Sequence, residues 1–299
     1  MELRHLRYFL TLAETLHFSR AAAQLEISPP ALTKQIQEIE GFLGVHLFQR
    51  TKRSVSLTGA GEAFLEEARR TLQQAAHAEE TARRAGRGEI GKIKIGYVAS
   101  AAYTGLLQTE IARFRQSHPL VKLTLLEAPM EPLPQQVSNG SIDLAFLRPP
   151  VACPSDVMLS TLLTDEFVAA LAQDSPLTQY ETLPSAALAD ADFILPEQAA
   201  GTMEVGRRGR FVPRQIASPG GLVAVITLVS LGQGMAIVPA SAMQTISMPG
   251  VVYRRLAGKT ISSTIALAFR RHEKSAVVRA FLKQLNQLSS QTDKKILLC

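Results

Sequence analysis

The chain has 299 residues, 46% of them hydrophobic, which is enough for about two domains with a buried core in each. Its formal net charge of +6 suits an anionic partner but does not locate one, since residues 1–55 hold seven Lys and Arg against five Asp and Glu, whereas residues 254–295 hold ten against two. No apolar run approaches 18 residues and no apolar signal segment opens the chain, so we expect a soluble cytoplasmic protein whose cysteines, Cys153 and Cys299, are reduced.

The first 40 residues predict three helices. Residues 3–16 repeat leucine and phenylalanine at helical spacing, and residues 18–40 predict two short helices joined by a tight connection. We expect Ser19 to cap the first of this pair and Ser28 the second, with Pro29 and Pro30 in the first turn, where a missing N–H has no penalty. The last helix directs Leu32, Ile36 and Ile39 inward, and its outward residues are Ala31, Thr33, Lys34, Gln35 and Gln37.

A small, polar outward face is typical of a recognition helix in the major groove of DNA. This stretch alone leaves an ordinary surface hairpin of helices as an equal alternative. The next residues favour DNA binding, because two short strand-like runs flank a basic tip, and such a wing can contact phosphates or enter the minor groove. Residues 1–58 therefore predict a winged helix-turn-helix domain whose DNA-binding residues are Ser28, Pro29, Pro30, Thr33, Lys34, Gln35, Arg50, Lys52 and Arg53.

A long helix is predicted from Gly59 to about Arg84, with Thr58 as its cap. It carries one apolar seam, and over about 40 Å, at 1.5 Å per residue, one seam cannot bury itself. The seam either lies on its own domain or, as we expect, pairs with a second subunit, which makes residues 59–90 a linker and dimerisation helix with a hinge. The seam residues are Phe64, Ala68, Leu72, Ala75 and Ala82.

The hinge contains Gly86, Gly88 and Gly91 in a G-x-G-x-x-G pattern. A dinucleotide-binding pattern must follow a strand and open a helix, but this one follows a helix and precedes a strand, so we reject that function. From Ile93 onward strands alternate with helices, which predicts mostly parallel sheets covered on both faces. The predicted strands are 92–98, 121–126, 144–147, 167–172, 193–195, 235–238 and 264–269, and the predicted helices are 104–117, 132–139, 220–231 and 275–288.

Several motifs resemble those of the LysR-type transcriptional regulators. They are Met1–Phe9, Phe18–Ala22, Leu43-Gly44-Val45-x-Leu47-Phe48-x-Arg50, Val55-x-Leu57-Thr58-x-Ala60-Gly61 and Val238–Ser241. Within that family the chain is most similar to the muconate- and chlorocatechol-responsive regulators of aromatic catabolism. The resemblance covers the whole chain.

The resemblance implies an α/β effector-binding domain over residues 91–299, built like a periplasmic solute-binding protein. Subdomain I would comprise residues 91–162 and 267–299, and subdomain II residues 163–266, joined by two crossing strands. It also implies a homotetramer of linker-helix dimers, a double-stranded DNA operator, a small-molecule effector, and RNA polymerase as a further partner.

Ligands of open α/β sheets bind beyond the carboxyl ends of the strands. The first strand leads into Ser100, whose hydroxyl and neighbouring N–H groups could bind a carboxylate; the alternative is that Ser100 merely starts a helix, and the family resemblance favours the ligand. Arg148 ends another strand, and both an anion ligand and a salt-bridge residue remain open there. Thr202 occupies the matching loop of the second subdomain. The predicted effector residues are Ala99, Ser100, Ala101, Pro129, Met130, Arg148 and Thr202.

Three positions depart from the family pattern. Relatives commonly carry Gln where this chain has Pro29 and Arg where it has Lys34, so we expect a different operator preference, because Pro29 cannot make a bidentate contact to adenine. Met130 stands where muconate-sensing relatives tend to have threonine, which favours a larger or more apolar ligand than muconate.

Catalysis is not predicted. There is no G-x-S-x-G nucleophile motif, and the six histidines form no metal-ligand pattern, so we expect no cofactor and no enzyme activity. We predict a ligand-responsive regulator of a catabolic operon for an aromatic or carboxylic acid, induced by an anionic carboxylate. Two alternatives remain: a member of the same family that senses an unrelated metabolite, and a constitutive DNA-binding protein with a vestigial binding domain.

Overall fold

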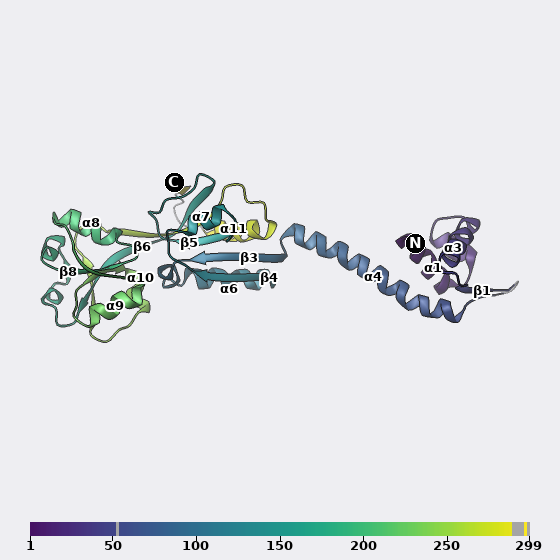
Figure 1. Ribbon diagram of the computed structural model, residues 1–299, viewed down its shortest axis with the longest axis horizontal. Coiled ribbons are helices and arrows are strands. Elements are labelled where there is room, and N and C mark those ends of the chain that lie inside the picture. Colours follow the sequence, from purple (N-terminus) through teal and green to yellow (C-terminus); the bar gives the residue numbers. More distant parts are fainter. Residues whose placement is uncertain (52–53, 289–295, 298–299) are drawn as a thin grey trace. The chain divides into compact units, whose positions relative to one another are not determined.

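The computed structural model describes residues 1–51, 54–288 and 296–297 of the chain (Figure 1). It divides into two compact units, Met1–Arg84 and Ala85–Cys299. The N-terminal unit contains α1 (Leu3–Thr15), α2 (Phe18–Gln24), α3 (Pro29–Leu43), β1 (Phe48–Arg50), β2 (Val55–Leu57) and most of α4 (Gly59–Arg87). β1 and β2 pair antiparallel and form the predicted wing.

The core of the N-terminal unit forms where the predicted inward faces meet. Leu32 and Ile36 are fully buried and Ile39 is 2% exposed, as the helical spacing predicts. Phe9 lies at the centre, with its ring centroid 5.3 Å from that of Phe48 and 4.8 Å from that of Phe64. Helices, wing and linker helix therefore share one core.

The predicted helix caps were partly correct. The N–H of Ala31 donates to Ser28 Oγ at 3.3 Å, which confirms Ser28 as the cap of α3. The prediction of Ser19 was wrong, because α2 already begins at Phe18, which packs on the core, and Ser19 is its second residue. His17 is the cap instead, and its Nδ1 accepts from the N–H of Arg20 at 3.4 Å.

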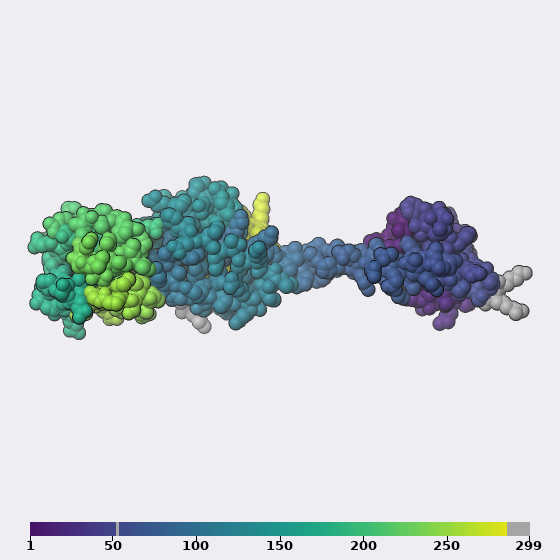
Figure 2. All heavy atoms as spheres, turned by 60° about the horizontal axis from the view of Figure 1, so that its bottom comes forward, coloured from purple at the N-terminus to yellow at the C-terminus, as the bar shows by residue number. Residues whose placement is uncertain are grey.

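The linker helix α4 uses its apolar seam in two ways. Phe64, Ala68 and Leu72 pack on the core of their own unit, so the first part of the seam is buried within the chain. Ala75 is half-buried and Ala82 is exposed, and the neighbouring residues of this part of α4 are exposed. Figure 2 shows this part of α4 as an open surface.

The second unit is built on a sheet whose strands lie in the order β4-β3-β5-β12-β6-β11-β7, with β10 and β13 also paired to β6. β3 is parallel to β4 and β5, whereas β12 is antiparallel to β5 and β6, so this sheet is mixed. A separate pair of parallel strands is β8-β9. The bounds are β3 (Ile90–Tyr97), β4 (Leu120–Glu127), β5 (Leu144–Leu147), β6 (Val157–Ala172), β7 (Thr182–Leu183), β8 (Asp192–Pro196), β9 (Arg214–Gly220), β10 (Ala236–Pro239), β11 (Val251–Leu256), β12 (Ser262–Arg270) and β13 (Ile296–Leu297).

Two long strands join the subdomains, as the family resemblance implied. The second half of β6 pairs with β10 and β11 of subdomain II, while β12 runs antiparallel along its first half (Figure 1). The predicted strand 167–172 covered only the buried half of β6, because residues 160–166 are half-buried or exposed and carry no continuous apolar run.

Helices cover the sheets of both subdomains. Subdomain I has α5 (Ala99–Ala102), α6 (Leu106–Ser117), α7 (Leu133–Ser138) and α11 (Ala276–Leu288); subdomain II has α8 (Ala200–Gly209), α9 (Leu222–Ser230), α10 (Ala240–Thr245) and the short 3₁₀ turns η1 (Pro176–Gln179) and η2 (Ser185–Leu188). The predicted two-part fold class is confirmed. Among the described residues, no helix is long and apolar enough to span a membrane.

Candidate DNA-binding face and effector cleft

The outward face of α3 presents the predicted DNA-binding residues. Pro29, Pro30 and Lys34 are exposed, and Lys34 forms no ion pair with any residue that the structure describes. The Thr33 hydroxyl donates to the Pro29 carbonyl at 2.9 Å, and Gln35 Nε2 donates to Glu38 Oε2 at 2.8 Å. Lys34 is therefore the cation on this face that is free to contact DNA.

Arg50 is engaged inside the N-terminal unit. Its Nη2 lies 3.2 Å from Glu40 Oε2, and its guanidinium lies 4.9 Å from the centroid of the Phe18 ring. The arrangement braces the wing against α2 and α3. Lys52 and Arg53 lie outside the described residues, so their contacts with DNA stay predictions.

Glu40 was not among the predicted residues, yet it organises the start of the wing. Its side chain is 8% exposed, and its Oε1 accepts from the N–H groups of Leu47 at 2.8 Å and Phe48 at 3.1 Å. A carboxylate four residues after the buried Ile36 lies on the inward face of α3, and that spacing could have identified it. Buried carboxylates need such partners, because an unpaired buried charge is strongly unfavourable.

Arg148 connects the two subdomains of the second unit. It follows β5 and is fully buried, and its Nη1 donates to Ser263 Oγ at 2.6 Å. Its Nη2 lies 3.1 Å from the Ser100 carbonyl oxygen, 3.3 Å from Ser241 Oγ and 3.5 Å from Asp165 Oδ2. The sequence left an anion ligand or a salt-bridge residue open here, and the structure shows the ion pair with Asp165.

The charge of Arg148 is only partly compensated. Burial lowers the pKa of the guanidinium and the nearby Asp165 carboxylate opposes this shift, while Nε has no hydrogen-bond partner within the described part of the chain. Arginine remains protonated at neutral pH even so. Next to Ser100, Arg148 therefore keeps one N–H donor without a partner among the described residues.

Met130 of subdomain I contacts two residues of subdomain II that line the cleft. Its N–H donates to Glu197 Oε1 at 2.5 Å, and its Sδ lies 3.3 Å from Gln198 Nε2. Gln198 also donates to the Arg148 carbonyl. Neither Glu197 nor Gln198 was predicted, because contacts between subdomains leave no periodic signal in the sequence.

The cavity between the subdomains is small. It has a volume of about 30 Å³, and Ala99 and Ser100 line it opposite Glu197, Gln198 and Gly221. This volume admits a molecule of about the size of water, whereas pockets for organic ligands measure about 300–1,000 Å³. The structure therefore has a closed cleft.

The remaining predicted effector residues are dispersed. Pro129 is exposed, and Ala101, within α5, is 1% exposed. Thr202 is fully buried in α8, and its Oγ1 has no partner among the described residues. Of the predicted set, the structure brings together Ser100, Met130 and Arg148 with their immediate neighbours.

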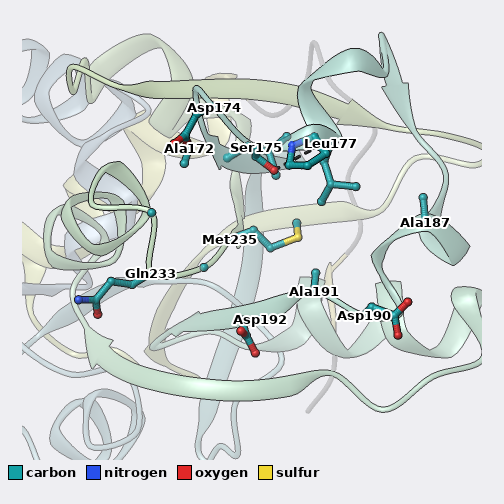
Figure 3. Close-up of a pocket in the computed structure, with 14 residues that line it drawn as sticks. Ala172, Asp174, Ser175, Leu177, Ala187, Asp190, Ala191, Asp192, Gln233 and Met235 are labelled. Carbon is teal, nitrogen blue, oxygen red and sulfur yellow. Dashed lines mark hydrogen bonds between the residues drawn. The ribbon is translucent and has the colours of Figure 1, made fainter.

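A larger cavity, of about 520 Å³, lies in subdomain II near the starts of β8 and β10 (Figure 3). Asp174, Asp190 and Asp192 line it together with Met235, and none of the predicted effector residues does. Its carboxylates disfavour an anionic ligand. Within the described residues, no group of three or more His, Cys, Asp or Glu could hold a metal ion.

Two family models match the chain. The model described as a bacterial regulatory helix-turn-helix protein of the lysR family matches residues 3–62, and the LysR substrate binding domain matches residues 86–289. The transcriptional regulator AlsR of Bacillus subtilis is 34% identical over 298 residues, covering 98% of each chain. ClcR of Pseudomonas putida is 32% identical, covering 97% of this chain and 100% of its own.

Solved structures show the same architecture. Full-length CbnR complexed with its target DNA matches with a TM-score of 0.84 and 26% identity, covering 97% of this chain and 100% of its own. Full-length OxyR from Pseudomonas aeruginosa matches with a TM-score of 0.65 and 25% identity, covering 96% and 99%. These comparisons show the LysR family, and the aromatic-catabolism subgroup stays a prediction.

Proposed function

Since the chain belongs to the LysR family of bacterial transcriptional regulators, and is not an enzyme, we propose that a small carboxylate in its cleft controls how it binds an operator. The proposed target is a catabolic operon for an aromatic or other carboxylic acid, and the protein acts in the cytoplasm. The observation that carries the proposal is the buried Arg148 beside Ser100, whose Nε has no hydrogen-bond partner among the described residues.

A second positive element supports an anionic ligand. α9 begins at Leu222, and its first residue outside the helix, Gly221, has no side chain to accept from the N–H groups of the first turn. Both residues line the cavity opposite Ser100. Unpaired N–H groups and the positive end of the helix dipole favour a carboxylate at such a position.

Glu197 limits the negative charge that the ligand can carry. Its carboxylate lines the same cavity, so a second negative charge on the ligand would be repelled. A hydroxyl or amino group on the ligand could instead donate to Glu197. We therefore favour a monocarboxylate with a hydrogen-bond donor, such as a hydroxy acid, over a dicarboxylate.

The proposed assembly is a homodimer through α4, with two dimers forming a homotetramer. The exposed part of the α4 seam supports a paired helix, and a two-fold dimer suits two DNA half-sites. Because the effector shifts the equilibrium between cleft conformations, it would change the spacing of the DNA-binding heads. RNA polymerase would be the further partner at an activated promoter.

A thermal-shift series on the full chain tests the ligand class, because a ligand that binds only the folded state raises its midpoint. The probes are benzoate, salicylate, lactate and cis,cis-muconate at matched ionic strength. We expect saturable stabilisation by salicylate or lactate, with an apparent Kd at least tenfold weaker in Ser100→Ala. Ser141→Ala, an exposed serine of the same subdomain, is the matched control.

Each outcome decides one part of the proposal. A Ser100→Ala variant that binds like Ser141→Ala would show that the ligand sits elsewhere. Stabilisation by muconate alone would contradict the proposal that Glu197 repels a second negative charge on the ligand. No stabilisation by any of the four carboxylates, in a chain that still binds DNA, would favour a different effector or a constitutive regulator.

A further inference from the structure

A basic hollow lies in subdomain I, away from the effector cleft. It measures about 620 Å³ and is walled by α6, α11 and the last residues of α4. Its lining includes Arg87, Arg113, Arg279 and Lys283, and no Asp or Glu is among the lining residues. None of these cations belongs to the DNA-binding face or to the cleft.

The walls of this basic hollow are held by buried contacts. Phe114 of α6 and Phe281 of α11 meet edge to face, with ring centroids 4.9 Å apart. Gln284 of α11, which also lines the hollow, donates to the Glu110 carboxylate at 2.9 Å and to its carbonyl at 3.1 Å. The spacing between the two helices is therefore set by the fold rather than by surface side chains.

Three of the cations have no counter-charge among the residues that the structure describes. Arg113, Arg279 and Lys283 are exposed and form no ion pair with any residue in the described ranges, whereas Arg87 is paired with Glu89. Like charges four residues apart on one helix, such as Arg279 and Lys283, repel each other. Nothing in the fold requires them to lie together.

The helix dipoles do not explain all of these cations. Arg87 is the last residue of α4, where a positive charge is favourable, whereas Arg113 lies before the last turn of α6. Arg279 is the fourth residue of α11, near its positive end, and no acidic residue occupies that first turn. Arg279 therefore destabilises its own helix, which points to a role outside the folded chain.

We propose that the basic hollow binds a small phosphorylated anion. Guanidinium groups match phosphate oxygens with paired N–H donors, and lysine adds a point charge. The volume of the hollow suits a small molecule. Ala276, the first residue of α11, lines the hollow, so the positive end of this helix faces the bound anion. A bound phosphate would join α6 and α11 to the end of α4, the segment that leads to the DNA-binding unit.

Isothermal titration of the full chain with inorganic pyrophosphate tests this proposal, with sodium sulfate at equal ionic strength as the reference anion. We expect saturable binding of pyrophosphate to the wild type, and an affinity at least tenfold weaker in Arg279→Gln/Lys283→Gln. Both side chains are exposed, so the fold should survive. Lys92→Gln/Lys122→Gln removes the same charge from β3 and β4 and should bind pyrophosphate like the wild type.

Two further titrations distinguish the sources of the phosphate group. Tighter binding of adenosine diphosphate or ribose 5-phosphate than of pyrophosphate would identify a phosphorylated metabolite, and the reverse order an inorganic phosphate. Equal pyrophosphate affinities in the two double variants would overturn the proposal. A second result would also overturn the proposal. If the wild type does not bind pyrophosphate, and Arg279→Gln/Lys283→Gln loses affinity for random-sequence DNA, the hollow contacts the DNA backbone instead.

Discussion

Among single residues, Glu40 holds the start of the wing through two backbone N–H groups. We expect Glu40→Ala to lower the free energy of local opening by about 2–3 kcal/mol, because two buried donors lose their acceptor. Hydrogen exchange of the peptide covering residues 44–50 in the full chain would then accelerate about 30-fold or more. Glu38→Ala, which removes an exposed contact with Gln35, should change exchange little; equal acceleration in both variants would contradict this role.

Lys34 is the second residue that a direct measurement can assign. If it reads a base, Lys34→Ala should weaken binding to the specific operator by about 1–3 kcal/mol and leave random DNA nearly unaffected. Equal losses on both DNAs in a fluorescence-anisotropy titration would make it a phosphate contact instead. Lys122→Ala, in the other unit, controls for the change in net charge.

Among the helices, α4 begins at a polar joint with the wing. The Thr58 hydroxyl donates to the His46 carbonyl at 2.7 Å and accepts from the N–H of Gly61 at 3.0 Å. We expect Thr58→Ala to reduce the stability of the N-terminal unit by about 1–2 kcal/mol, while Thr58→Ser keeps both bonds. Faster hydrogen exchange over residues 59–64 measures the effect, and a Thr58→Ser variant as labile as Thr58→Ala would refute it.

Gly61 strengthens this joint. A Cβ at this position would lie 2.1 Å from the Leu47 carbonyl oxygen. Any residue other than glycine would therefore push α4 away from the start of the wing. The motif that resembles the LysR family contains this glycine, and the structure gives it a steric reason.

Elements with strong periodicity were predictable, and those held by tertiary contacts were not. Leu144–Leu147 was predicted residue for residue because β5 is wholly buried. α8 was missed because its glycines suggest a loop; yet a Cβ on Gly201 would lie 2.7 Å from the Phe167 ring, so packing requires that glycine. β9 and β11, which are mostly half-buried or exposed, also escaped the sequence pattern.

The candidate site residues also divide into those that local sequence predicts and those that depend on tertiary contacts. Ser28, Lys34, Ser100 and Arg148 could be proposed from the sequence because each lies at a helix start, on a helix face or at a strand end, positions that the sequence specifies locally. Residues that matter through distant partners were missed, since such pairings arise only on folding: Glu40, Asp165, Glu197 and Gln198.

For the whole molecule, the proposed dimer depends on the exposed part of the α4 seam. Ala68, Ala75 and Ala82 repeat every seven residues, as in a paired helix. We expect Ala75→Glu/Ala82→Glu to weaken self-association at least tenfold in sedimentation equilibrium. Gln73→Glu/His77→Glu adds charge to the opposite face of α4 and should leave association unchanged; equal effects of the two pairs would place the interface elsewhere.

The contacts that Met130 makes with Glu197 and Gln198 have a kinetic consequence for any effector bound beside Ser100. A cavity of about 30 Å³ cannot admit an organic acid, so these contacts must break before the ligand enters. In stopped-flow experiments the observed binding rate should therefore rise with ligand concentration and then reach a plateau at the opening rate. The measured affinity includes the free energy of opening, so contacts that exist only in the closed cleft can set the concentration at which the gene responds.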